Sequence, residues 1–222
     1  MGHGTGLERL FQTGRPERGR AWAKALIAEL SATPLAICDP QIEQGPDNFY
    51  YLGQALGEGA DAAVFDDVLP FCTEQAHCGL VLFRDVTRAG DPEWVFSLGD
   101  LWSIRMFGSI DGDPDDLAES EPEAPAEAES REILLAAPSE SFLPEAMKEA
   151  LGNFVKDALD LPDAPDVALM VAPNLRPTRI LMLKVRTAAF RDAAHRDAVL
   201  HAAGWFLPRH RGVMFMPDGW ED

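Results

Sequence analysis

The segment 111–129, DGDPDDLAESEPEAPAEAE, divides the chain because it is unsuited to a folded core. It holds nine acidic residues, three prolines and no basic residue. A stretch of this kind buries too little apolar surface to offset the entropy lost on ordering. Its charge also favours an extended chain. We therefore expect an acidic, Pro/Glu-rich linker at 111–130, with an N-terminal domain at 1–110 and a C-terminal domain at 131–222.

Apolar runs and helical patterns alternate after this segment. In chain order they are an apolar run at 133–135, a helical pattern (Met147, Leu151, Phe154, Val155, Leu159), two runs at 167–171 and 180–185, a helical stretch at 188–205 and a last run at 213–216. Pro144 stands where a first helical turn begins, as proline often does. The alternation predicts a βαββαβ domain with the ferredoxin-like arrangement.

The N-terminal half is less regular. An amphipathic helix starts at Leu7, is interrupted by Gly-Arg-Pro at 14–16, continues over 21–30 and ends before Pro34. Short strands are predicted at 35–38, 79–83 and 94–97, with a polar loop at 39–48. The stretch 50–56 suits a strand or a helix, and the segment around 101–107 is apolar enough for a core. We expect a mixed α+β domain, and an α+β fold for the whole chain.

The charge excludes some partners. The net charge of −18 argues against nucleic acid and anionic membranes. Most of the acidic residues lie in 32–169, which holds 29 Asp and Glu against 6 Lys and Arg. This excess of negative charge either serves solubility or forms a face for a basic partner. The apolar runs are all much shorter than the roughly 18 residues of a membrane helix. The start, MGHGTGLERLF, lacks the features of a secretory signal. Three sparse cysteines fit reduced thiols, so we expect a cytoplasmic protein.

Several small clusters are candidates for chemistry. Cys72, His77 and Cys78 are soft ligands, but their C-x4-H-C spacing does not match a four-ligand zinc site. Cys72 and His77 could also form a nucleophilic pair, whereas the alternative is buried structural thiols beside a partly exposed histidine. His195 and His201 point to different faces of their helix, since six residues correspond to about 600° of rotation.

The remaining motifs are incomplete. The carboxylates of DGDPDD resemble the opening of a calcium loop, but position six is Asp116 and position twelve is Pro122, where glycine and glutamate are needed. GEG at 57–59 and GHGTG at 2–6 lack the ending of a phosphate loop, and GxSxG does not occur. His210 lies between Arg209 and Arg211. These three residues form either a solvated basic cluster or an anion site. We expect no catalytic residue, no cofactor and no metal.

The C-terminal half resembles the C-terminal domain of the SseB family, the enhanced serine sensitivity proteins. The resemblance is carried by ILLAAPSESFLPEAMKEAL, by the strand pair VALMVAP and RILMLKV, and by LPRHRGVMFMP. LERLF followed by AWAKALIAEL also resembles the opening of that family. The match covers about the last 90 and the first 30 residues. The resemblance implies no catalytic residue. The family is linked only by its name to a serine-sensitivity phenotype.

One face of the C-terminal sheet is a candidate interaction surface. Side chains alternate along a strand, so Leu181, Leu183 and Val185 should lie under the helices, and Met182 and Lys184 should face away from them. The candidate face comprises Met170, Met182, Lys184, Met214 and Met216. Methionine suits an adaptable contact surface, and apolar patches on monomers are rarely left uncovered. The N-terminal domain, a second copy or a partner would cover this face, unless long Lys and Arg stems cover it within the chain.

These observations favour a non-catalytic regulatory or protein-binding module, with this chain itself or another protein as the partner. A small-molecule-binding protein, for an amino acid or a related metabolite, is the alternative hypothesis. An enzyme with an unrecognised site is the third.

Overall fold

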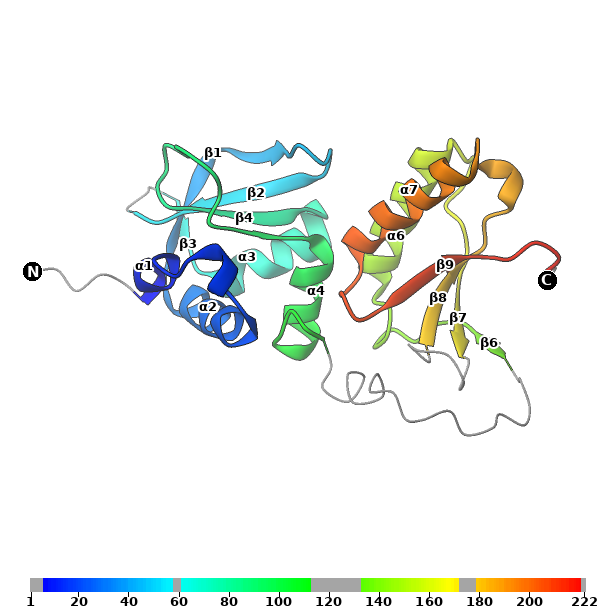
Figure 1. Cartoon of the computed structure of the whole chain (residues 1–222), viewed down its shortest axis with the longest axis horizontal. Coiled ribbons are helices and arrows are strands. Elements are labelled where there is room, and N and C mark those ends of the chain that lie inside the picture. Colours follow the sequence, from blue (N-terminus) through cyan, green and yellow to red (C-terminus); the bar gives the residue numbers. More distant parts are fainter. Residues whose placement is uncertain (1–5, 58–60, 113–132, 172–178, 221–222) are drawn as a thin grey trace, which may run out of the picture. The chain divides into compact units, whose positions relative to one another are not determined.

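The computed structural model describes residues 6–57, 61–112, 133–171 and 179–220 (Figure 1). It contains helices and two mixed sheets, which confirms the α+β class. The chain divides into two compact units, Met1–Asp111 and Gly112–Asp222. The predicted linker lies outside the described residues, except for its first two positions. Within the described ranges, no helix is long and apolar enough to cross a membrane.

The N-terminal unit is built on a five-stranded sheet with the order β3-β1-β2-β4-β5. Its strands are β1 (Leu35–Gln44), β2 (Tyr50–Ala55), β3 (Ala62–Ala63), β4 (Gly79–Phe83) and β5 (Trp94–Phe96). Strands β2 and β4 are parallel, and the other neighbours are antiparallel. The strands predicted at 35–38, 79–83 and 94–97 are therefore confirmed, and the ambiguous stretch at 50–56 is a strand.

Helices supply the other half of this unit's core. They are α1 (Gly6–Phe11), α2 (Arg20–Ala32), α3 (Phe65–Pro70), a π-helical turn η2 (Phe71–Ala76) and α4 (Leu98–Phe107), with a 3-10 turn η1 (Arg15–Glu17) between α1 and α2. Both α1 and α2 were predicted, and their apolar faces are buried as the spacing requires: Leu7, Leu26 and Leu30 are all 0% exposed. They pack with Leu80 and Leu82 of β4 in one hydrophobic cluster.

The loop predicted at 39–48 is wrong over its first half. Strand β1 continues to Gln44 and pairs there with β2, after a change of register between Ile37 and Ile42. The side chains from Asp39 to Gln44 are exposed, so the segment lacks the alternation of burial that identifies a strand. Pro40 lies within the shift of register, where a strand tolerates proline.

A buried ion pair joins the α1–α2 connection to β5. Arg18 and Glu93 lie 2.8 Å apart, and their side chains are 3% and 12% exposed. Arg18 also donates to the carbonyls of Phe11 and Thr13, and its guanidinium lies 4.8 Å from the Trp22 ring centroid. The Trp22 ring in turn packs at 4.9 Å against Trp94 of β5. The ion pair, the hydrogen bonds and the ring packing therefore all hold the α1–α2 region against β5.

Acid should weaken this cluster. Burial alone would raise the pKa of Glu93, but hydrogen bonds from Arg18 and Arg84 outweigh burial and lower it below its ordinary value. A carboxylate with a lowered folded-state pKa stabilises the fold above its unfolded pKa, and this contribution is lost as the pH falls through the folded value. We expect Glu93→Gln to be less stable than the natural chain at pH 7, with the difference shrinking below about pH 4.5. Urea unfolding at pH 7, 5, 4 and 3 measures it, and a difference independent of pH would contradict it.

The C-terminal unit has a four-stranded sheet with two helices. Its strands are β6 (Leu134–Ala136), β7 (Val167–Val171), β8 (Arg179–Leu183) and β9 (Gly212–Phe215). Its helices are α6 (Glu145–Leu159) and α7 (Ala193–Ala203), with 3-10 turns η3 (Thr187–Ala189) and η4 (Gly204–Phe206) on either side of α7. The predicted sequence of strands and helices is confirmed in these described segments, although the second helix is shorter than 188–205.

The ferredoxin-like arrangement is not confirmed. The sheet order is β6-β7-β8-β9, in which strands consecutive in the chain are neighbours. A split βαβ unit places another strand between its two strands. Here β6 pairs directly with β7 in antiparallel fashion, and β8 pairs directly with β9 in parallel fashion. The apolar pattern predicts which segments become strands, but it carries no information on which strands pair.

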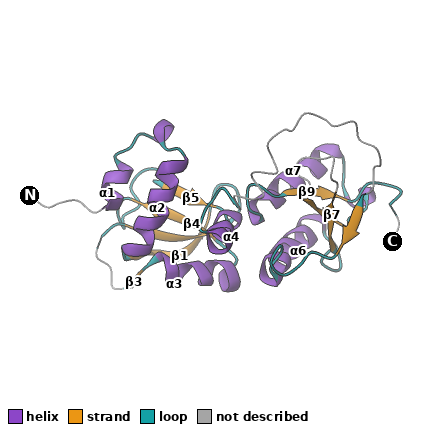
Figure 2. Ribbon diagram, turned by 90° about the horizontal axis from the view of Figure 1, so that it is seen from below, coloured by secondary structure: helices purple, strands orange, loops and turns teal. Residues whose placement is uncertain are grey.

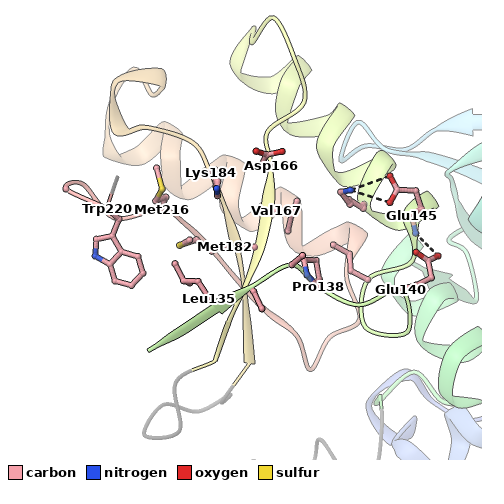
Figure 3. A pocket seen from close by; sticks show the side chains of 16 residues that line it. Leu135, Pro138, Glu140, Glu145, Asp166, Val167, Met182, Lys184, Met216 and Trp220 are labelled. Carbon is pink, nitrogen blue, oxygen red and sulfur yellow. Dashed lines mark hydrogen bonds and ion pairs between the residues drawn. The ribbon is translucent and has the colours of Figure 1, made fainter. Parts of the chain in front are cut away.

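One face of this sheet packs against the helices. Leu181 and Leu183 of β8 are fully buried, and Val185 is 3% exposed, as the predicted row requires. Figure 2 shows α6 and α7 with the strands of this unit, and Figure 3 shows both helices behind β7 and β8. Met147 and Leu151 of α6 are also fully buried. The alternate side chains of β8 therefore lie on the face that the helices do not cover.

Candidate functional site

The five residues predicted as an interaction surface share this second face. Met182 pairs with Ala168 of β7 and Met214 of β9, and Met170 pairs with Ile180. Residues opposite each other across strands lie on the same face, as do residues two apart along one strand. Lys184 and Met216 follow Met182 and Met214 by two positions. We call this surface the open face.

The open face is partly covered within the chain. Met170 is 3% exposed and Met182 is 1% exposed, whereas Lys184, Met214 and Met216 are half-buried. The expected wide apolar patch is therefore reduced, because its two central methionines are almost out of reach of solvent.

A groove of about 870 Å³ runs along the open face (Figure 3). Three of the five predicted residues, Met182, Lys184 and Met216, line it, and Met170 and Met214 do not. The other lining residues are Leu135, Ala136, Ala137, Pro138, Glu140, Leu143, Glu145, Lys148, Asp166, Val167, Ala168, Gly219 and Trp220. The volume is in the range of pockets that bind ligands.

Trp220 forms one wall of the groove, and sequence reasoning missed it. A turn folds the last described residues back, since the Trp220 amide donates to the Pro217 carbonyl at 3.3 Å and Gly219 has φ +83°. The hydroxyl of Thr187 donates to Asp218 at 2.6 Å and holds the turn. Figure 3 places the indole beside Met216, with Met182 and Leu135 nearby. The Pro-Asp-Gly signature of a turn was the available signal.

The opposite wall comes from the segment before α6. Leu143 is 2% exposed and fixes this segment to the core. The Glu140 carboxylate accepts a hydrogen bond of 3.0 Å from the Glu145 amide at the start of α6. Glu145 also pairs with Lys148 at 3.3 Å. A negative group at a helix N-terminus is favourable, so this wall is held by local electrostatics.

The groove ends at an exposed apolar strand. In the described part of the sheet β6 is an edge strand. Ile133, Leu134 and Leu135 are 43%, 60% and 50% exposed. Leu135 lines the groove, whereas its neighbour Leu134 points to the other face of the strand. Exposed apolar side chains on a sheet edge are a favourable place for another chain to bind.

The charged side chains of the groove are carboxylates and lysines. Its charged members are Glu140, Glu145, Lys148, Asp166 and Lys184. None of the described lining residues is Ser, Thr, Cys or His, the side chains that most often act as nucleophiles or as general bases at neutral pH.

The Cys72–His77–Cys78 cluster fits the structural alternative, in which buried thiols lie beside a partly exposed histidine. Both thiols are fully buried, and His77 is half-buried with a left-handed backbone at φ 46° that ends η2. The hydrogen bond to Cys78, together with burial, raises the pKa of the Cys72 thiol, which opposes a role as nucleophile. All three cysteines are free. Across the described ranges, no group of three His, Cys, Asp or Glu side chains is placed to hold a metal ion.

The other histidines do not form a site together. His195 accepts a hydrogen bond of 3.3 Å from the Arg191 amide, and His201 is exposed on α7. Of the two alternatives for residues 209–211, solvation does not hold for Arg211. Its guanidinium donates to the Phe142 carbonyl and lies 4.3 Å from the Phe142 ring centroid, and the residue is 9% exposed.

No family model, curated protein or solved structure matches this chain.

Proposed function

We propose that this chain is a non-catalytic protein-binding module that receives an extended segment of a partner protein in the open-face groove. The observation that carries the proposal is the continuity of the groove with the exposed strand β6. Met216 and Trp220 offer apolar surface beside the nearly buried Met182, and methionine and tryptophan are enriched at contact surfaces. The similarity of the quoted motifs to the SseB family is part of this proposal.

The charge favours a basic partner over a second copy of the chain. The groove is lined by three carboxylates and two lysines. The whole chain has a net charge of −18, so two copies repel each other. A partner segment with apolar side chains and flanking lysines or arginines matches both the apolar surface of the groove and the negative charge of the chain. We place the module in the cytoplasm, since three free, buried thiols fit a reducing compartment.

Adjacent leucines on β6 give a matched test. Leu135→Asp puts a charge on the groove wall, and Leu134→Asp puts the same charge on the other face of the strand. Both positions are at least half exposed, so neither change should unfold the chain. We expect Leu135→Asp to weaken partner binding by about tenfold or more, equal to about 1.4 kcal/mol, and Leu134→Asp to leave it within about twofold.

Quantitative mass spectrometry of proteins retained by the immobilised full chain, compared with the two variants, measures this difference. Circular dichroism confirms that each variant is folded, and Trp220→Ala is a second groove variant. Proteins retained equally by the natural chain and by both groove variants would contradict the proposal. Equal loss with both leucine variants would also contradict it, because binding would then depend on the strand edge and not on the groove.

A further inference from the structure

A second hollow lies in the N-terminal unit, on the sheet face opposite its core. Its floor is Gly53 of β2, Val81 of β4 and Val95 of β5, which stand opposite one another across the three strands. Their sequence neighbours Leu52 and Leu80 belong to the core cluster, so the floor faces the other way. The β1–β2 hairpin and the loop after β4 form its walls, with a volume of about 400 Å³.

The floor is apolar. Gly53 is close to Cys38, and an added Cβ there would lie 2.9 Å from the Cys38 Cβ. Val95 is 42% exposed, although it is an apolar residue on the floor of the hollow. Phe83 also lines the hollow, together with prolines from both walls. These surfaces fit a small ring or a branched aliphatic group.

The rim of the hollow is net negative. Glu43 and Asp47 are on one wall and Arg88 is on the other. The two terminal nitrogens of Arg88 already donate, one to the Glu43 carboxylate and one to the Asp39 carbonyl at 3.0 Å. Asp47 accepts from the Tyr51 hydroxyl at 2.6 Å and from the Phe49 amide at 3.2 Å.

Glu43 is the accessible charge of this rim, because its side chain is 60% exposed while that of Arg88 is 24% exposed. An anionic ligand would have to displace Glu43 from Arg88, whereas a cationic ligand can share the exposed Glu43 carboxylate with Arg88. The net charge of the chain also attracts cations.

We propose that this hollow binds a small arylalkylamine, with the ring on the Gly53, Val81 and Val95 floor and the ammonium group beside Glu43. The site is separate from the open-face groove, so it neither depends on the proposed protein-binding function nor tests it.

Three probes with one ring and different charge test the ligand class. They are 2-phenylethylamine, 2-phenylethanol and 3-phenylpropionate, titrated into the full chain by calorimetry at low salt. We expect the amine to bind about three- to fivefold more tightly than the alcohol, which is the size of one solvent-exposed ion pair, and the acid to bind most weakly. Equal binding of the three probes, or no binding of the amine, overturns the proposal.

Variants locate the site. Val81→Phe fills the floor and should abolish amine binding, and Val95→Phe serves if Val81→Phe does not fold. Val86→Phe makes the same change at a 49% exposed position outside the lining and should leave binding unchanged. Glu43→Gln should remove the preference for the amine over the alcohol and strengthen binding of the acid, because Arg88 loses its carboxylate partner. Amine binding that survives both floor variants, or a preference that survives Glu43→Gln, overturns the proposed placement.

Discussion

Replacing Arg18 with alanine is expected to lower the free energy of unfolding by about 3–5 kcal/mol. The side chain is 3% exposed and makes an ion pair with Glu93 at 2.8 Å. It also donates to the carbonyls of Phe11, Thr13 and Glu93. Truncation leaves the largely buried Glu93 carboxylate with Arg84 as its remaining ion-pair partner among the described residues, and it removes the Arg18 donor from the Thr13 and Glu93 carbonyls. Buried polar groups that lose a hydrogen-bond partner are costly. Urea unfolding followed by circular dichroism measures the loss.

Arg15 provides the matched control. It pairs with Asp91 at 3.5 Å, but the two side chains are 59% and 82% exposed. An exposed ion pair contributes about 0–1 kcal/mol, so Arg15→Ala should change the stability by less than about 1 kcal/mol. If the two alanine variants were equally stable, the Arg18 cluster would not contribute to the stability of the N-terminal unit as argued.

Leu151→Ala is expected to destabilise the C-terminal unit by about 2–5 kcal/mol. Leu151 is fully buried on α6, in the same helical row as Met147 and Val155, which are also fully buried. Truncation removes apolar contacts and leaves a cavity beneath the sheet. Hydrogen exchange read by mass spectrometry should show a lower free energy of opening for α6 and β8 than in the natural chain.

Leu134→Ala makes the same chemical change in the same unit. Leu134 is 60% exposed on β6, so its truncation should change stability by less than about 0.5 kcal/mol. Protection of α6 that is unaltered by Leu151→Ala would show that this helix is not held by the row of buried side chains.

The sequence predicts most of the individual helices and strands, because their buried apolar residues recur at the helical or strand period. Leu26 and Leu30 on α2 and Leu181 and Leu183 on β8 are fully buried, at the spacings from which their elements were predicted. The extension of β1 to Gln44 was missed, since its outer half is exposed on both faces and leaves no period to read. The ferredoxin-like order failed for a different reason. Pairing of β6 with β7 is a tertiary property that no local pattern encodes.

The lining of the candidate groove was predicted in part. The alternation along β8 brought Met182 and Lys184 to one face, and both line the groove. It did not show that Met182 is almost fully buried, because that burial depends on segments remote in the chain. Trp220 reaches the groove through a turn beyond the last strand, and Glu140 reaches it through the cap of α6. The hollow above Gly53 requires the long hairpin of β1, so it was hidden by the same error that shortened that strand.

The Trp22–Trp94 pair gives the N-terminal unit an optical signature of its own. The two indole rings are 4.9 Å apart at an interplanar angle of 45°, and one sits on α2 while the other sits on β5. Chromophores this close and held at a fixed tilt couple their electronic transitions, which adds an exciton band to the circular dichroism spectrum. The band depends on the rings remaining together and not on the helicity of α2. Stopped-flow measurements at its wavelength therefore follow the docking of α2 onto β5 separately from the formation of the helix.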